Sequence, residues 1–192
     1  MNLLHIDSSA LGQNSVTREL TAAIVARWSA ALPGLQVEYR DLDQQPLPHL
    51  TAGSLAGADP AEAEAAGHTL QQVLAADVIV VGAPMINFSI PSTLKAWIDR
   101  IAVAGRTFRY TENGPEGLAG GRKVIVASAR GGVHAGAPTD FQEPYLRQVF
   151  GFLGIDDVEF VRAEGVAYSP QHRSDAIAAA KAAIPAPERK AA

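Results

Sequence analysis

Short apolar runs alternate with helical patterns along the whole chain, and this alternation constrains the fold more than any other feature. Five runs are predicted to be strands: residues 3–7, 35–42, 77–84, 123–129 and 158–168. The helical patterns between and after them cover 15–32, 62–76, 91–103, 141–154 and 174–184. The run DVIVVGAP is β-branched through its centre, which is typical of a strand buried on both faces. Since such crossovers force parallel pairing, we expect an α/β fold with a doubly wound, five-stranded parallel sheet of order 2-1-3-4-5 and helices on both faces.

Three segments fall outside the strand and helix alternation. Residues 44–60 are loop with room for one helical turn, and residues 106–121, with strand-like residues around Asn113-Gly114-Pro115, indicate a small hairpin or flap. Residues 185–192 have no pattern and are predicted to fray. With 192 residues and no visible linker, the sequence predicts a single domain over residues 1–184.

Composition excludes several classes of function. The chain has 16 Lys and Arg against 20 Asp and Glu, a net charge of −4, so it lacks the basic footprint of a protein that binds nucleic acid or an anionic membrane. It has no Cys, and its five His show no metal-ligand spacing, so no metal site is predicted. The start of the sequence lacks the basic region of a signal peptide, and no apolar run is long enough for a membrane span. We therefore expect a soluble, cytoplasmic protein.

The predicted strand order nominates a ligand site. Ligands of a doubly wound sheet bind beyond the carboxyl ends of the strands where the order reverses. That rule selects three segments, called here the first loop (7–15), the second loop (83–90) and the third loop (129–138).

The first loop has the composition of an anion site. Its hydroxyl residues Ser8, Ser9 and Ser15, with Thr17 just beyond, crowd the start of a helix, where free amides and the helix dipole favour negative charge. The alternative is that Ser15 only caps the helix. Neither dinucleotide nor nucleoside-triphosphate motifs are present, which favours a monophosphate. Arg18, the nearest cation, is on the helix, where its side chain can point away from the ligand, so it is not assigned to the site.

The second and third loops have the composition of a pocket for a flat ring. The second loop, APMINFSI, has bulky apolar side chains that either tuck against the core or form the wall of a flat pocket. In the third loop, Gly131 and Gly132 permit close approach of the backbone to a planar ligand, although a plain turn is the better explanation of a Gly pair taken alone. Together with a monophosphate site, these loops favour a flat heterocycle with one phosphate, and flavin mononucleotide (FMN) is the candidate.

Three stretches carry a family resemblance that runs from residue 1 to about 184. APMINFSIPSTLKAWID, TFRYTENGPEGL and SARGGVHAGAPTDFQEPYL are similar to the FMN-dependent NADH-azoreductase family, whose members are also called FMN-dependent NADH:quinone oxidoreductases. The resemblance implies a flavodoxin-like fold and a homodimer.

The resemblance also implies roles for individual residues. The phosphate loop of the family matches Ser9, Ser15, Val16 and Thr17; its flavin-ring loop matches Met85, Ile86, Asn87 and Phe88; its pyrimidine-side segment matches Ala129, Arg130, Gly131 and Gly132. Ile86 stands where the family usually has Tyr, and Ala129 where it usually has Ser, a lost hydroxyl that Ser128 or backbone amides would have to replace. Candidates for the substrate pocket are Phe108, Tyr110, His134 and Phe160.

The implied reaction is ping-pong transfer of a hydride from NADH or NADPH through FMN to quinones or azo compounds. The cofactor would carry the chemistry, so no catalytic residue is obligatory and none is assigned. The sequence leaves the choice between NADH and NADPH open. The main alternative is a flavodoxin-type electron carrier, which the modest charge and the aromatic flap argue against; a flavin-dependent repressor or scaffold has no basic patch to support it.

Overall fold

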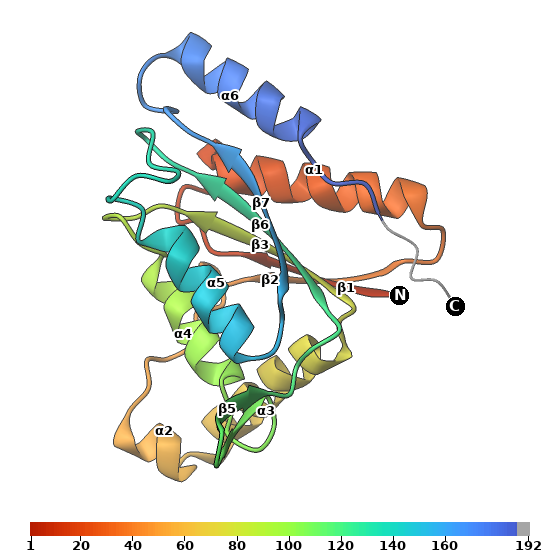
Figure 1. Cartoon of the computed structure of the whole chain (residues 1–192), viewed down its shortest axis with the longest axis vertical. Helices are drawn as coiled ribbons and strands as arrows, with labels where there is room; N and C mark the ends of the chain where they lie inside the picture. The colour runs from red at the N-terminus through yellow and green to blue at the C-terminus, as the bar shows by residue number, and fades with distance from the viewer. Residues whose placement is uncertain (188–192) are drawn as a thin grey trace.

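The predicted sheet is present in the computed structural model, which describes residues 1–187 (Figure 1). Its strands are β1 (Asn2–Asp7), β2 (Gln36–Asp41), β3 (Val78–Pro84), β6 (Lys123–Ala129) and β7 (Asp157–Ala163). They lie in the order β2-β1-β3-β6-β7, and every pair is parallel. Counted along the sheet strands alone this is the order 2-1-3-4-5, so the flavodoxin-like prediction is confirmed. Residues 188–192, the greater part of the tail expected to fray, lie outside the described residues.

Helices cover both faces of the sheet, as Figure 1 shows. On one face lie α1 (Val16–Ala31) and α6 (Pro170–Ala182), with Trp28 and Ile24 buried beneath them. On the other lie α3 (Pro60–Ala75), α4 (Ser92–Ile101) and α5 (Gln142–Phe152), packed around Trp97 and Phe150. Truncating one of these large buried side chains costs about 3–5 kcal/mol, so the two apolar layers fix the sheet that carries the loops.

Side-chain caps set where several helices begin. Ser15 accepts a hydrogen bond from the Arg18 amide at the start of α1, and Asp59 caps α3 ahead of Pro60. Ser169 caps α6, whose first residue is Pro170, so the helix begins four residues before the predicted start at 174. The short α2 (Ala52–Ala56) is the single turn expected within 44–60.

The last strand is shorter than predicted. The pattern indicated a strand to Tyr168, but β7 ends at Ala163. Gly165, at φ 68°, bends the chain, and its amide donates to the carbonyl of Gly132. The amide of Val166 donates to the carbonyl of Arg130 in the same way. The segment after β7 therefore packs against the third loop instead of extending the sheet.

The predicted flap is an antiparallel hairpin of β4 (Phe108–Thr111) and β5 (Gly114–Gly117). Part of its docking is through backbone, since a Cβ on Gly117 would lie 2.1 Å from the Gly154 nitrogen, and the Ala119 amide donates to the Leu153 carbonyl. Because α4 and α5 end there and β6 starts there, the hairpin lies at the amino-terminal edge of the sheet, opposite the three loops (Figure 1).

Candidate functional site

The three loops meet at the carboxyl edge of the sheet, as the strand order requires. Ser8 in the first loop donates its hydroxyl to the Gly82 carbonyl at 2.6 Å. The Met85 amide in the second loop donates to the Ala129 carbonyl in the third at 2.9 Å. These bonds make one continuous surface from the first loop to the third. A 3-10 turn, η1 (Gly12–Asn14), completes the first loop.

The start of α1 presents unpartnered amides at this surface. Ser15 Oγ accepts from the Arg18 amide at 3.2 Å and lies 3.1 Å from Thr17 Oγ1. Among residues 1–187, no acceptor meets the amides of Val16 or Thr17. Ser15 therefore caps the helix and also stands beside two free donors, so the two interpretations of this residue are compatible. Free first-turn amides with flanking hydroxyls form the kind of site that binds a phosphate.

Arg18 does not belong to this anion site, because its guanidinium points away. Its Nη1 and Nη2 lie 2.5 and 2.8 Å from the carboxylate of Asp41, and Nε and Nη2 donate to the Ser9 carbonyl at 3.2 and 2.8 Å. The hydrogen bond from Arg18 lowers the pKa of Asp41 to about 2. Arg18 thus holds the backbone of the first loop through a carbonyl and leaves the amides of Val16 and Thr17 free.

A carboxylate lies under the first loop as well. Asp7 is buried, and burial raises its pKa, but His5, Thr21 and Arg18 together outweigh burial and leave the pKa below its usual value. Its carboxylate fits because β3 has no side chain at Gly82, where a Cβ would lie 2.8 Å from Asp7 Oδ1. The acidic group is therefore fixed behind the first loop by Thr21 of α1 and by the space that Gly82 leaves.

The second loop is a two-residue turn in a strained conformation. The amides and carbonyls of Ile86 and Ser89 bond reciprocally, at 2.9 and 3.0 Å. Between them Asn87 (φ 47°) and Phe88 (φ 68°) both lie in the left-handed region. Asn tolerates this region, but a bulky residue there is an outlier that costs about 1–3 kcal/mol. Phe88 is nevertheless half exposed, so the loop is not tucked against the core, and its strain aims an aromatic ring at the surface.

The third loop faces the second through His134. The rings of Phe88 and His134 meet edge to face, with centroids 5.8 Å apart. Nδ1 of His134 lies 2.9 Å from Thr139 Oγ1, which orients the imidazole. His134 is thus the predicted pocket residue that this chain places beside its own second loop.

Arg130 is committed to the interior of the protein. Its side chain is fully buried, and its guanidinium pairs with three carboxylates, those of Asp140, Glu143 and Glu164. Only the main chain of this predicted residue can line a ligand. The amides of Gly131 and Gly132 have no hydrogen-bond partner within residues 1–187 and remain available.

The hydroxyl of Ser128 is not a substitute for the one missing at Ala129. It lies 3.2 Å from Gln142 Oε1 and accepts from Arg130 Nε at 3.2 Å, inside the protein. Any compensation for Ala129 must therefore come from backbone amides.

The remaining predicted pocket residues lie elsewhere in this chain. Phe108 and Tyr110 are on the hairpin at the opposite edge of the sheet, where Phe108 packs on Phe152 with ring centroids 4.5 Å apart. Phe160 lies in the middle of β7, with the guanidinium carbons of Arg147 and Arg162 4.7 and 5.4 Å from its ring centroid. One copy of the chain does not bring these aromatic residues to the three loops.

The sequence analysis did not identify Glu164, whose carboxylate accepts hydrogen bonds from two amides of the third loop. Its Oε1 accepts from the amides of His134 and Ala135 and from Arg130 Nη1. A signal was present: Arg130 and Glu164 each follow one member of the pair Ala129 and Ala163, which are in register on neighbouring parallel strands. Once the two strands are aligned, opposite charges one residue beyond that pair predict an ion pair.

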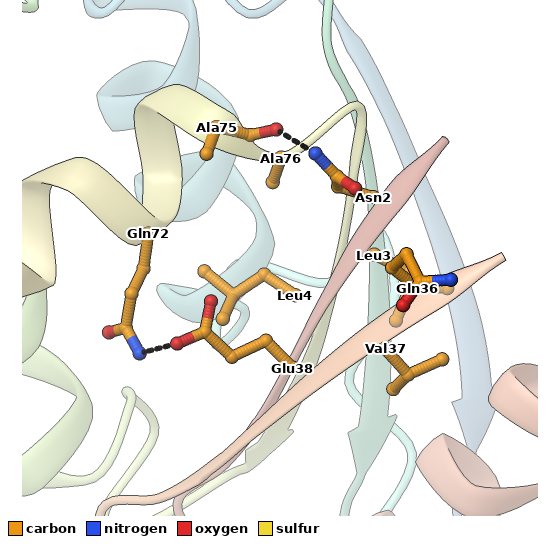
Figure 2. A pocket seen from close by; sticks show the side chains of 9 residues that line it. All are labelled: Asn2, Leu3, Leu4, Gln36, Val37, Glu38, Gln72, Ala75 and Ala76. Atoms are coloured by element: carbon orange, nitrogen blue, oxygen red, sulfur yellow. Dashed lines mark hydrogen bonds between the residues drawn. The ribbon is translucent and has the colours of Figure 1, made fainter.

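One cavity lies away from the loops, and another borders the first of them. The first, of about 260 Å³, is at the amino ends of β1 and β2, where Gln72 bonds Glu38 and Asn2 bonds the Ala75 carbonyl (Figure 2). The second, of about 670 Å³, borders the first loop and the start of α1, and its lining includes Ser15, Asp7 and Asp41. Because carboxylates disfavour a neighbouring phosphate, the part of this cavity beside Asp7 and Asp41 is a poor anion site, and the candidate donors are the free amides of Val16 and Thr17.

Residues 1–187 contain neither a cluster of metal ligands nor a helix suited to span a membrane. No cluster of three metal-ligating side chains is arranged around a common point. No helix in this part of the chain combines the length and the apolar character needed to cross a bilayer.

The loops fit a flat ligand with one phosphate. The α1 amides and hydroxyls offer donors to an anion, the Phe88 ring offers an apolar face, and the amides of Gly131 and Gly132 offer donors to the polar edge of a ring. No nucleophile with an adjacent base occurs in the loops, so the chemistry would come from the ligand.

Comparisons with known proteins agree with this geometry. Residues 1–186 match the protein family described as having a flavodoxin-like fold. The chain is 66% identical over 188 residues to an FMN-dependent NADH:quinone oxidoreductase of Stenotrophomonas maltophilia, covering 98% of this chain and 96% of that one. It is 71% identical over 184 residues to FMN-dependent NADH:quinone oxidoreductase 1 of Xanthomonas euvesicatoria, covering 96% and 95%.

Solved structures of azoreductases have the same fold as this chain. A Bacillus anthracis azoreductase superposes with a TM-score of 0.84 at 31% identity, covering 95% of each chain. An FMN-dependent NADH-azoreductase of the same species, solved in complex with FMN, superposes with a TM-score of 0.85 at 26% identity, covering 96% of this chain and 98% of that one.

Proposed function

The chain belongs to the flavodoxin-like family of FMN-dependent NADH:quinone oxidoreductases, and from this premise we propose that it is an FMN enzyme that reduces quinones and azo compounds with NADH. The strongest support is one combination of features. The amides of Val16 and Thr17 are free beside two hydroxyls, and the second loop presents the ring of Phe88, whose backbone is strained. A phosphate and a flat ring, joined in one ligand, account for both features.

The proposed cofactor residues divide into a phosphate end and a ring end. Ser9, Ser15, Val16 and Thr17 would hold the phosphate through hydroxyls and amides. The ring would rest against the second loop, 85–88, with its pyrimidine edge at the Gly131 and Gly132 amides. Bound there, FMN supplies the capacity to accept a hydride from a nicotinamide and to deliver it to an oxidised acceptor.

The protein residues around the ring position the reactants. The Phe88 and His134 rings border the face on which a nicotinamide or a quinone would stack. With one such face, donor and acceptor would occupy it in turn, which gives ping-pong kinetics. Solvent would supply the proton of the product, so no side chain is assigned as an obligatory acid.

A visible spectrum of the purified protein tests the cofactor and the reaction together. We expect flavin absorption that NADH bleaches and a quinone restores. A colourless protein that cannot be reconstituted with FMN would overturn the proposal. Steady NADH oxidation with a quinone and no partner protein would distinguish the enzyme from a flavodoxin-type carrier.

Donor and acceptor preferences need steady-state kinetics. In double-reciprocal plots of initial rate against NADH concentration, parallel lines at several fixed quinone concentrations would support the ping-pong order, and intersecting lines would contradict it. NADPH is proposed as a second donor, which the ratio of kcat/KM for NADH and NADPH measures. We propose quinones as the better acceptors because they need only the stacking geometry; a higher kcat/KM for azo dyes would reverse that ranking.

We also propose that the active unit is a homodimer. Phe108, Tyr110 and Phe160 lie far from the loops of their own chain, so only a second copy could bring them to the pocket. Exposed apolar side chains on and near the loops would suit such an interface, among them Phe88, Val133, Phe141 and Tyr168. Light scattering coupled to gel filtration measures the assembly, and a fully active monomer would contradict it.

A further inference from the structure

The carboxylate of Glu164 is the centre of the hydrogen bonds that shape the third loop. Its Oε1 accepts from the amide of His134 at 2.7 Å and the amide of Ala135 at 2.9 Å. The same oxygen accepts from Arg130 Nη1 at 3.2 Å. One oxygen therefore fixes two consecutive peptide groups of a glycine-rich loop to the end of β7.

The rest of the ion cluster lies below the loop. Arg130 Nη1 and Nη2 lie 2.9 and 3.3 Å from the carboxylate of Asp140, and Nη2 lies 2.9 Å from Glu143 Oε1. Arg162 pairs with Glu143 through both of its carboxylate oxygens. Arg130 therefore stays neutralised without Glu164, so the task that falls to Glu164 alone is its contact with the loop amides.

The loop that Glu164 fixes carries the groups aimed at the ring end of the site. The free amides of Gly131 and Gly132 and the His134 ring that meets Phe88 all lie within four residues of one another. The Gly132 carbonyl accepts from Gly165, so the loop is bonded on its other side to the residue after Glu164. A glycine-rich segment without these bonds would lose the conformation that points its donors outward.

We propose that Glu164 is a positioning residue for the cofactor: by accepting from the His134 and Ala135 amides it pre-orients the third loop toward the pyrimidine edge of the flavin. This inference rests on the proposed function and deepens it. Glu164 touches neither cofactor nor substrate. Its effect reaches the ligand through the loop, as preorganisation of a site by a supporting hydrogen bond.

Hydrogen exchange in the cofactor-free protein tests the positioning step. In Glu164→Ala we expect peptides covering 131–136 to exchange at least about tenfold faster than in the wild type, because two charge-assisted bonds are lost. Glu164→Gln keeps an acceptor oxygen and should restore most of the protection. Unchanged exchange in Glu164→Ala would overturn the proposal without any reference to flavin binding.

Flavin titration tests the consequence for the ligand. Glu164→Ala should raise the Kd for FMN roughly tenfold, about 1.4 kcal/mol. It should raise the Kd for riboflavin, which lacks the phosphate, by the same factor, because the loop faces the ring. Ser15→Ala supplies the contrast, since it should weaken FMN and leave riboflavin unchanged. An FMN-selective loss in Glu164→Ala would overturn the assignment to the ring.

Glu62→Ala is the matched control for general destabilisation. Glu62 pairs with Arg100 at 2.5 Å, and the side-chain exposures of 19% and 5% are close to the 18% and 0% of the Glu164–Arg130 pair. This pair joins α3 and α4 and contacts none of the three loops. We expect wild-type exchange of 131–136 and wild-type flavin affinity in Glu62→Ala, and an equal rise in Kd there would overturn the proposal.

Hydrogen exchange and flavin titration together distinguish failure of this proposal from failure of the proposed function. A wild-type protein that binds neither FMN nor riboflavin would overturn the function and the cofactor role of Glu164 together, while the exchange measurement still reports on the loop. Normal flavin binding by wild type and Glu164→Ala alike would overturn only the role of Glu164.

Discussion

The first and third loops are each fixed by one charged side chain, Arg18 and Glu164, but the backbone groups that are bonded differ. In the first loop Arg18 donates to a carbonyl, that of Ser9, and the amides of Val16 and Thr17 stay free. In the third loop a carboxylate, Glu164, accepts from two amides. The loop expected to bind an anion is thus held through an acceptor, which keeps its donors for the ligand.

The two arginines at these loops, Arg18 and Arg130, differ in burial. Arg130 is fully buried among carboxylates, whereas the Arg18 side chain is 17% exposed and the paired Asp41 side chain 16%. Water can therefore compensate partly for the loss of Arg18 but not for the loss of Arg130. The difference implies that the third loop is coupled to global stability and the first loop to local order.

The largest expected effect separates these two arginines. Arg130→Met leaves three carboxylates without their buried partner and should lower the free energy of unfolding by about 3–5 kcal/mol. Arg18→Met removes a partly exposed pair and should cost about 1.5 kcal/mol. Urea unfolding followed by circular dichroism measures both. Equal losses would remove the distinction between a buried and a solvent-compensated loop support.

The second loop, which lies between the other two, is the next test. Among residues 1–187 no ion pair reaches its 85–88 segment, and its shape comes from a strained turn. Phe88→Asn replaces a bulky residue by one that tolerates positive φ, so stability should stay the same or rise by about 1 kcal/mol. Loss of the ring should raise the Kd for FMN about tenfold. A thermal melt and a flavin titration give the two numbers, and reduced stability with normal affinity would contradict the strain argument.

A smaller effect, expected at low pH, tests the pairing of Asp41 with Arg18 beside the first loop. The pKa of Asp41 is about 2 in the folded protein against 3.8 for the unperturbed carboxyl, because it accepts hydrogen bonds from Arg18. Its contribution to stability is therefore complete above about pH 4 and is lost as the pH falls toward about 2. Asp41→Asn should lower stability at neutral pH and flatten the decline across this window. Urea unfolding at several pH values between 2 and 6 provides the slopes, and parallel slopes would show that Asp41 does not couple to acid unfolding.

The smallest expected effect concerns Ile86. Its side chain is half exposed, and its contribution to the turn is made by backbone bonds to Ser89. Ile86→Tyr should therefore change the free energy of unfolding by less than about 0.5 kcal/mol and leave the Kd for FMN unchanged. The KM for a quinone should shift by a few-fold, because a larger ring would border the stacking face. A changed Kd with a constant KM would place Ile86 on the cofactor instead of the substrate.

Much of the fold followed from the sequence because its signals are local. Runs such as DVIVVG and caps such as Ser15 are readable residue by residue, and the parallel order follows from the crossovers. The errors lie where tertiary contacts override the pattern. VEFVRAEGVAY looks like one strand, but Gly165 turns the chain back against the third loop. The pair Ser169 and Pro170 was a start signal for α6 that an Ala-rich pattern beginning at 174 obscured.

The meeting of the three loops at one edge of the sheet was predictable, but the directions of their side chains were not. Strand order and loop composition identify the segments, but they do not say where a side chain points. The sequence assigns Arg130 to the ligand surface, yet its side chain is buried. Strand register explains this burial, because it brings Glu164 alongside Arg130. The strain at Phe88 could not be read either, because nothing in the sequence sets a positive φ for a Phe.

The way in which the hairpin is attached has an evolutionary consequence. The contact of Gly117 with Gly154 and the bond from Ala119 to Leu153 are made by main-chain atoms, and Tyr110 is three-quarters exposed. Selection can therefore act on Tyr110 almost independently of selection for folding. In the dimer proposed above, a lineage that gains or loses a substrate could record the change at Tyr110, while the glycine pair of the hairpin contact stays constrained.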